Sequence, residues 1–326
     1  MKHDLFKSIP ADVLAQLNNI GMALNSTSKN QEVNNLLNKT VLIGGKRLRP
    51  LLTLLMGNLY NINSDDLAPY AKSIELVHAA SLAHDDVVDN ATTRRGNPSI
   101  NIVSSNKYAV LSGDYLLADV IVGLCNLGNL ELVKEMSLVI QELSEGEWIQ
   151  LNASKSREYT REVIELIAMK KTSSVLSWCT VAPAIYAGLS PTIVDYARKL
   201  GAKLGLAFQM MDDTLDFSGN SQKDAFLDLD NGIINSVIFE WLIENNDSYE
   251  KFKNGMDLQS IWCNANFTDA IQVVENKAQS LLKESQEILD IMVKELSLIP
   301  ESNHEQIQKA AMPITKIIEF IGNRNF

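Results

Sequence analysis

The stretch HDDVVDNATTRRG, residues 84–96, places Asp85, Asp86 and Asp89 within five positions. The preceding stretch SIELVHAASLA, residues 73–83, has apolar residues at three- and four-residue steps and no Gly or Pro, which predicts a helix. If the helix continues, Asp85 and Asp89 share one face, with Cβ atoms roughly 5–6 Å apart. Carboxylates that close repel each other unless a cation lies between them. The stretch indicates a site for a hard cation, Mg²⁺ or Mn²⁺; the alternative is a solvated acidic helix end.

A second stretch, FQMMDDTLDF at residues 208–217, repeats this acidic spacing after another apolar helical pattern. Its aspartates are Asp212, Asp213 and Asp216. Two such helices could face each other across a helical bundle and form one cage for several divalent ions. Metal ions held in this way would bind a diphosphate and neutralise its charge as it leaves. All six aspartates of the two stretches are therefore candidate metal ligands.

The length allows one large domain or two, and the composition argues against long linkers and against several kinds of partner. Of the 326 residues, 46% are hydrophobic, and the 8 prolines and 16 glycines are too thinly spread for long linkers. The net charge is -11 and there is no basic run, so we expect no nucleic-acid partner. The best apolar candidate for a membrane helix, YAVLSGDYLLADVIVGL at residues 108–124, is interrupted by two aspartates. We expect no membrane span and at most a peripheral membrane contact.

The cysteines and the N-terminus predict a cytoplasmic location. Cys125, Cys179 and Cys263 are isolated and lack the spacing of metal sites or redox motifs, which is typical of reduced thiols. The stretch MKHDLFKSIP has no apolar segment of the kind found in signal peptides.

Helical patterns follow one another along the chain. They cover 10–40 (interrupted by a turn at 25–30), 47–61, 65–90, 106–126, 129–151, 158–187, 191–218, 231–246, 268–297 and 303–321. No stretch shows the sustained two-residue alternation of a sheet. The sequence therefore predicts an all-α single domain over residues 1–326, a bundle of long, mostly antiparallel helices around a central cavity.

The two acidic stretches, together with GGKRLRP at residues 44–50, resemble the all-trans polyprenyl diphosphate synthases, which have the class I isoprenoid synthase fold and two DDxxD motifs. The resemblance extends to the closing IGNRNF at residues 321–326. It implies a homodimer with about three Mg²⁺ per site. It also implies that an allylic diphosphate ionises and is attacked by isopentenyl diphosphate, after which the released diphosphate takes the proton.

The resemblance also implies roles for individual residues. Those that match the family's isopentenyl-diphosphate site are Lys46, Arg49, His78 and Arg95. Those that match its allylic-diphosphate site are Arg94, Lys171, Thr172, Gln209 and Lys223. Of these, Arg94, Lys171 and Lys223 would stabilise the departing diphosphate with the metal-binding Asp85, Asp89 and Asp212. Without the resemblance, residues 44–50 would be an ordinary basic helix start and His78 a core histidine.

The chain departs from the family pattern after the second motif. Lys223 and Asp228 can be matched to the family's first Lys and its Asp, in a loop about three residues shorter than usual. The family's second Lys is missing, because Ile233 follows Gly232, and Asn-Ser-Val at 235–237 replaces Thr-Leu-Pro. One phosphate-binding cation is lost, which predicts weaker diphosphate binding or loop closure.

Product length can be inferred from the helix that carries the first motif. Each helical turn rises about 5.4 Å, close to one extended isoprene unit. Ala80 and Ser81 are small, Val77 and Ile74 follow, and Tyr70 is the first large obstacle. This predicts a hexaprenyl to decaprenyl product, unless a neighbouring helix closes the tunnel earlier.

Other functions stay open at the level of sequence. They are geranylgeranyl or farnesyl diphosphate synthesis, a class I terpene cyclase, and a non-catalytic subunit of a heteromeric prenyl synthase. A cyclase would not need the cations Lys46, Arg49 and Arg95, and a non-catalytic subunit should have lost its acidic motifs.

Overall fold

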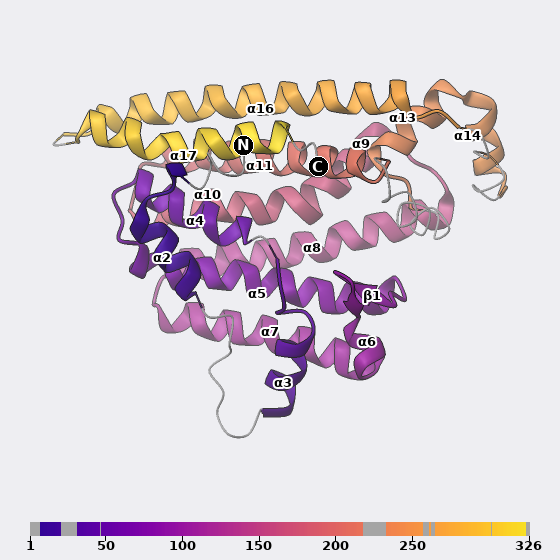
Figure 1. The fold of residues 1–326 in the computed structure, drawn as a ribbon, viewed down its shortest axis with the longest axis horizontal. Coiled ribbons are helices and arrows are strands. Elements are labelled where there is room, and N and C mark those ends of the chain that lie inside the picture. Colours follow the sequence, from indigo (N-terminus) through magenta and orange to yellow (C-terminus); the bar gives the residue numbers. More distant parts are fainter. Residues whose placement is uncertain are drawn as a thin grey trace.

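Long α-helices make up most of the protein, and many of them run along its longest axis (Figure 1). The computed structural model describes residues 7–20, 31–45, 47–217, 233–256, 261, 265–300 and 302–323. The helices are α2 (Ala11–Asn19), α3 (Gln31–Lys39), α4 (Leu48–Leu59), α5 (Ser64–Val88), α6 (Ile100–Val103), α7 (Asn106–Asn126), α8 (Leu130–Ser156), α9 (Arg161–Ala168), the π-helix η1 (Met169–Ser173), α10 (Ser174–Tyr186), α11 (Pro191–Leu215), α13 (Ser236–Glu244), α14 (Asn246–Lys253), α16 (Thr268–Ser297) and α17 (His304–Gly322). The predicted all-α architecture is confirmed.

The helices stack in layers around α10. Figure 1 shows α16 and α17 along the upper edge and α7 towards the lower edge, with α8, α10 and α11 between them. Nearly every residue of α10 is buried, because α4, α8 and α11 pack against it. A helix that is apolar on all sides has to lie inside the protein, which explains why α10 forms the centre of the core.

The start signals of α5 and α11 place both acidic stretches at helix ends. Asn63 Oδ1 accepts a hydrogen bond from the Asp65 backbone N–H at 3.1 Å and caps α5. Ser190 Oγ caps α11 by accepting from the Ile193 N–H at 3.4 Å, and Pro191 occupies its first position. Since both helices begin at these caps and run for 25 residues, their C-terminal turns carry the acidic motifs.

Most predicted helix boundaries are close to the observed ones, and two, 106–126 and 268–297, coincide with α7 and α16. The predicted helix 158–187 is α9, η1 and α10 in sequence, because a π-helical turn interrupts the regular hydrogen bonding. The helices α6 and α14 were not predicted. The expected turn at 25–30 lies outside the described residues.

A short hairpin follows α5 and was also not predicted. Its strands are β1 (Thr93–Arg94) and β2 (Asn97–Pro98), paired antiparallel. The two turn residues, Arg95 and Gly96, both have positive φ, at 52° and 77°. A two-residue loop with this backbone joins strands of the natural twist, which accounts for the hairpin despite its short strands.

In the part of the chain that the structure describes, α7 is the one helix with the length and apolar composition needed to cross a membrane. About a third of its apolar window (33%) is buried inside the protein, largely against α5. The remaining surface includes the exposed side chains of Tyr108, Leu111 and Val122.

Candidate active site

The C-terminal ends of α5 and α11 meet at one cavity of about 400 Å³. Asp85 and Asp89 line it from α5, and Asp212 and Asp216 line it from α11 and its C-cap. Neither helix has a basic residue in its last turn. A helix C-terminus carries partial negative charge, so carboxylates there are unfavourable unless a cation joins them. Both helix ends therefore favour cations in the cavity between them.

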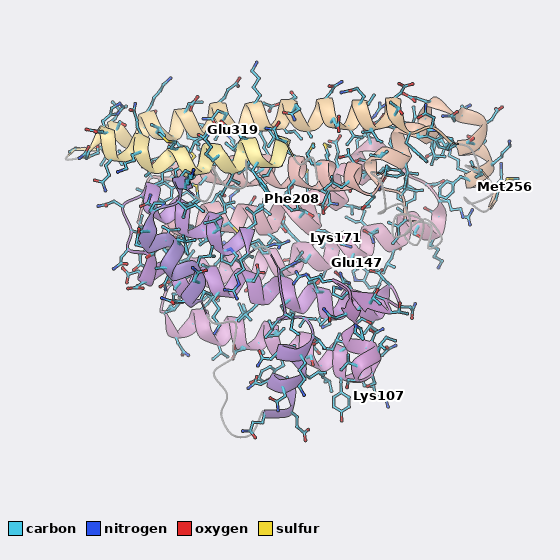
Figure 2. The ribbon with its side chains drawn as sticks, in the orientation of Figure 1. Lys107, Glu147, Lys171, Phe208, Met256 and Glu319 are labelled. Atoms are coloured by element: carbon cyan, nitrogen blue, oxygen red, sulfur yellow. The ribbon has the colours of Figure 1, made fainter. Side chains whose placement is uncertain are left out.

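A lysine approaches the cavity from the π-helix η1. Lys171 Nζ donates to Glu147 Oε2 at 2.5 Å and to Gln150 Oε1 at 3.1 Å, both on α8. Figure 2 labels Glu147 and Lys171 beside each other in the middle of the protein. The neighbouring Lys170 donates to Glu145 at 2.6 Å and does not line the cavity. Of the two adjacent lysines, the structure brings Lys171 to the site.

The middle aspartate of the first motif is held away from this cavity. Asp86 is fully buried, and its Oδ1 accepts from Arg94 Nε at 2.7 Å. Its Oδ2 accepts from the Ile100 backbone N–H at 3.3 Å. Asp86 is not among the residues that line the cavity, and its expected role as a metal ligand stays a prediction. Asp86 instead ties the hairpin arginine and the start of α6 to α5.

The middle aspartate of the second motif is held by neutral donors. Asp213 Oδ1 accepts from Gln209 at 2.9 Å, and Oδ2 accepts from the hydroxyl and backbone N–H of Ser236 at 2.6 and 3.0 Å. Burial raises the pKa of Asp213 to about 6, although these hydrogen bonds act in the opposite direction. Asp213 is 7% exposed and borders the cavity. Its expected role as a metal ligand stays a prediction, because a carboxylate oxygen that accepts a hydrogen bond keeps a lone pair for a cation.

Gln209 continues this network to the π-helix. Its amide oxygen accepts from the Thr172 hydroxyl at 2.6 Å, so Thr172, Gln209, Asp213 and Ser236 form one chain of hydrogen bonds from η1 through α11 to α13. Ser236 stands in the segment that replaces the family's Thr-Leu-Pro, and its hydroxyl donates to Asp213. Ile233, in place of the missing lysine, lines the cavity with an apolar surface.

The acidity of Asp85 is altered by its surroundings. Burial raises its pKa to about 6, and the charges of Glu147 and Asp89 raise it further, while Lys171 opposes the shift. A carboxylate in this position is short of positive charge. It gains more from a bound cation than an exposed carboxylate would.

The donor set of the cavity fits magnesium or manganese. Among the described residues that line it, six are acidic, and two, Arg49 and Lys171, are basic. No group of three or more His, Cys, Asp or Glu in the described ranges is close enough to hold a metal ion by itself. Oxygen donors on opposite walls instead suit Mg²⁺ or Mn²⁺ that completes its coordination with diphosphate oxygens and water. An anionic substrate would be repelled here without such cations.

The residues expected to hold isopentenyl diphosphate lie on a neighbouring wall. Arg49 and His78 line the cavity, and Arg49 Nε is buried without a hydrogen-bond partner among the described residues. Burial lowers the pKa of His78 well below its usual value, and three nearby arginines lower it further, so the imidazole is neutral. Arg95 lines a small adjoining cavity with His78 and donates to the Ile43 carbonyl at 3.0 Å.

Two of the expected site residues, Lys46 and Lys223, lie outside the described residues, as does Asp228. Arg47, the remaining cation of residues 44–50, donates to the carbonyls of Leu17 and Ile20 at the end of α2. This contact holds α2 against the start of α4.

Sequence reasoning missed Glu147, Gln150 and Ser236. The stretch EGEWIQ at residues 145–150 carried a signal, since Glu147 and Gln150 are three positions apart and so share a helix face. No spacing rule predicted Ser236, because its partner Asp213 is 23 residues away.

A second cavity of about 330 Å³ adjoins the acidic one at Asp85. The two cavities share four lining residues, which are Ser81, Asp85, Leu143 and Glu147. Away from this junction, the second cavity is lined mainly by apolar side chains of α5, α7 and α8, among them Val77, Leu117 and Ile140. An apolar channel therefore begins where the acidic site ends.

Comparison with known proteins agrees with this site. A sequence model of the polyprenyl synthetase family matches residues 30–274. Solanesyl-diphosphate synthase 1, mitochondrial, from Oryza sativa subsp. japonica is 31% identical over 303 residues, covering 86% of this chain and 69% of that protein.

Solved structures share the fold at lower identity. The crystal structure of a decaprenyl diphosphate synthase from Rhodobacter capsulatus aligns with a TM-score of 0.77 and 24% identity, covering 99% of this chain and 98% of that one. The polyprenyl synthase from Caulobacter crescentus CB15, complexed with calcium and isoprenyl diphosphate, aligns with a TM-score of 0.74 and 24% identity over 96% and 95% of the two chains. The family match spans most of the sequence, and the Oryza protein exceeds 30% identity across most of both chains. This chain therefore belongs to the polyprenyl synthetase family.

Proposed function

We propose that this chain, a transferase, joins isopentenyl diphosphate to an allylic diphosphate and repeats the step to make a long all-trans polyprenyl diphosphate. The observation that carries the proposal is the junction of two cavities at Asp85, one acidic and one largely apolar. A substrate with a charged head and an apolar tail fits this pair of cavities. The Oryza and Rhodobacter relatives are named for solanesyl and decaprenyl products.

Asp85, Asp89, Asp212 and Asp216 would hold Mg²⁺, with Mn²⁺ as a substitute and three ions per site as the proposed number. When bound, Mg²⁺ neutralises the charge that develops on the departing diphosphate. Lys171 donates to a diphosphate oxygen as the carbon–oxygen bond breaks. Arg94 makes two bonds to Asp86 and is not among the residues that line the cavity, so its proposed contact with the same diphosphate rests on the family pattern.

Arg49, His78 and Arg95 would bind the diphosphate of isopentenyl diphosphate, with Lys46 added from the family pattern; the same pattern adds Lys223 to the residues that would bind the allylic diphosphate. A neutral His78 donates one hydrogen bond without adding charge. Arg49, whose Nε lacks a partner among the described residues, gains a hydrogen bond when the diphosphate arrives. The bound double bond is then positioned to attack the allylic carbon, and the released diphosphate accepts the proton.

The second cavity would hold the growing tail and so limit product length. Val77 and Ser81 line it in the same helical stripe as Asp85, whereas Ala80 is completely buried and is not among its lining residues. The predicted ruler therefore runs along the Val77–Ser81 stripe and not through Ala80. Tyr70, the expected obstacle, packs against Tyr186 with ring centroids 5.6 Å apart and is not among the lining residues.

Incubation with labelled isopentenyl diphosphate, allylic primers of several lengths and Mg²⁺ tests the proposal. Chromatography should show prenyl diphosphates of six to ten units, the range predicted above. Cyclised hydrocarbons would indicate a terpene cyclase. Absence of turnover in the pure protein, restored by a second polypeptide, would indicate a subunit of a heteromeric synthase.

We also propose a homodimer formed through the outer faces of α7 and α8, and a cytoplasmic location. Both helices expose large apolar side chains, including Leu111 and Val122 on α7 and Leu130 and Trp148 on α8. Contiguous exposed apolar surface is typical of interaction sites. Light scattering should show a dimer for the wild type and a monomer for Leu111→Glu, and imaging of a tagged chain tests the location.

A further inference from the structure

Glu147 lies where the acidic cavity meets the tail cavity. Of the four residues shared by the two cavities, it is the one besides Asp85 that carries a charge. Its side chain is 17% exposed, so its charge is largely shielded from water. Nothing in the proposed reaction yet gives this carboxylate a role.

The backbone of α8 comes unusually close to the π-helix at this point. A Cβ atom on Gly146 would lie 2.7 Å from Lys171 Cγ and 2.8 Å from Lys170 Cβ, which is too close for a side chain. The glycine lets the two elements touch. It thereby places Glu147 against Lys171 on the cavity side and Glu145 against Lys170 on the other side.

The contacts of Lys171 leave one donor for a ligand. An ammonium group has three N–H donors, and Glu147 and Gln150 accept two of them. Glu147 Oε1 is buried and has no hydrogen-bond partner in the described part of the chain. A buried carboxylate oxygen without a donor is unfavourable, and such exceptions call for an explanation.

Lys171 interacts with two carboxylates at the junction of the cavities. Its charge acts on Asp85, the outer aspartate at the junction, and its hydrogen bond goes to Glu147. A lysine side chain is long and flexible, so without Glu147 its ammonium would be drawn to Asp85. An ammonium bound to Asp85 would occupy an oxygen that a divalent cation needs.

We propose that Glu147 is a positioning residue that keeps the Lys171 ammonium away from Asp85, so that Asp85 stays available to the metal and Lys171 keeps an N–H for the allylic diphosphate. This inference rests on the proposed function, since it assigns Asp85 to the metal and Lys171 to the diphosphate. In this proposal Glu147 contacts neither the metal nor the diphosphate, but it determines how Asp85 and Lys171 bind them.

The test compares Glu147→Gln with the matched control Glu145→Gln, two residues away on the same helix, which removes the nearer of the two carboxylate partners of Lys170. We expect Glu147→Gln to raise both the Mg²⁺ concentration for half-maximal rate and the KM for the allylic diphosphate by about tenfold. The KM for isopentenyl diphosphate and the melting temperature should change little. Glu145→Gln should leave all four quantities near the wild-type values.

Binding measured without turnover gives an independent readout. Calorimetry with Mg²⁺ and inorganic diphosphate should show weaker binding to Glu147→Gln than to the wild type or Glu145→Gln. If Glu147 acts through Lys171, then Glu147→Gln should add little further loss of binding to a Lys171→Met variant. Equal binding by both glutamine variants, or full additivity with Lys171→Met, would overturn the inference. A wild type that binds Mg²⁺ and diphosphate but makes no prenyl product would instead count against the proposed function.

Discussion

The ends of α5 and α11 carry the same acidic spacing but are built differently around it. In both, the first and last aspartates line the cavity, and protein donors hold the middle one. Asp86 is held by the charged Arg94, whereas Asp213 is held by the neutral groups of Gln209 and Ser236. Each motif therefore has two parts: its outer residues face the cavity, where we propose that they bind the metal, and its middle residue attaches the next segment of the chain.

The residue one turn before each motif also differs. Ser81 precedes Asp85 by four positions and borders the tail cavity, whereas Phe208 precedes Asp212 by four positions and fills the corresponding place on α11. Figure 2 labels Phe208 on the opposite side of Lys171 from Glu147. The small residue borders the tail cavity on α5, and the large one borders the acidic cavity on α11, so the proposed path of the tail follows α5.

The largest expected effect is on the outer aspartates. Asp85→Ala or Asp212→Ala should each lower kcat by about a hundredfold to a thousandfold, because each removes a group that stabilises the departing diphosphate through the metal. The melting temperature of the metal-free protein should not fall, since each change relieves repulsion between like charges. Steady-state kinetics at saturating Mg²⁺ measures the loss. Near-normal turnover of either variant would show that the two helix ends do not share one metal site.

Replacing either middle aspartate should lower the free energy of unfolding, and the two losses should differ in size. Asp86→Asn breaks a buried ion pair, and we expect the free energy of unfolding to fall by about 3 kcal/mol, the low end for such pairs because Arg94 is partly exposed. Asp213→Asn should cost about 1 kcal/mol or less, since it removes no ionic partner. Urea unfolding measures both. A larger loss for Asp213→Asn would reverse the proposed distinction between the charged and neutral attachments.

Replacing Ser81 by Phe makes the turn before the first motif resemble that before the second. Ser81→Phe should shorten the main product towards farnesyl or geranylgeranyl while condensation continues, because the ring would enter the tail cavity. Ala80→Phe is the matched control: Ala80 is 0% exposed, so overpacking should cost about 1–3 kcal/mol of stability. Chromatography of products and thermal unfolding separate the two effects. Equal shortening by both variants would place the channel elsewhere.

The helical pattern predicted the ends of α5 and α11 to within about three residues, and the acidic spacing predicted that the outer aspartates of each motif share a helix face. The repetition of the motif indicated only that the two faces could meet. The acidic spacing could not distinguish Asp86 from Asp85, since the distinction depends on Arg94 turning back through a hairpin that no strand pattern predicted. Ala80 and Ser81 are equally small in sequence, and only the packing of α7 and α8 against α5 shows which one borders the cavity. Contacts between distant segments decided these roles.

The smallest expected effect is a pH-dependent gain in stability when Asp85 loses its charge. Burial raises the pKa of Asp85 from 3.8 to about 6, so between these values the folded state binds more protons than the unfolded state. The free energy of unfolding therefore falls as pH rises through this range, and the loss is complete above it.

The test compares the metal-free wild type with Asp85→Asn. Between about pH 4 and neutral pH, the free energy of unfolding of Asp85→Asn should rise by about 1–2 kcal/mol relative to that of the wild type. Thermal unfolding in a metal chelator measures this, with Asp89→Asn as the control on the same helix end. Addition of Mg²⁺ and inorganic diphosphate should stabilise the wild type more than Asp85→Asn, because only the wild type keeps the full set of ligands. A constant difference between the two proteins across the pH range would show that Asp85 keeps an ordinary acidity and has no special need for a cation.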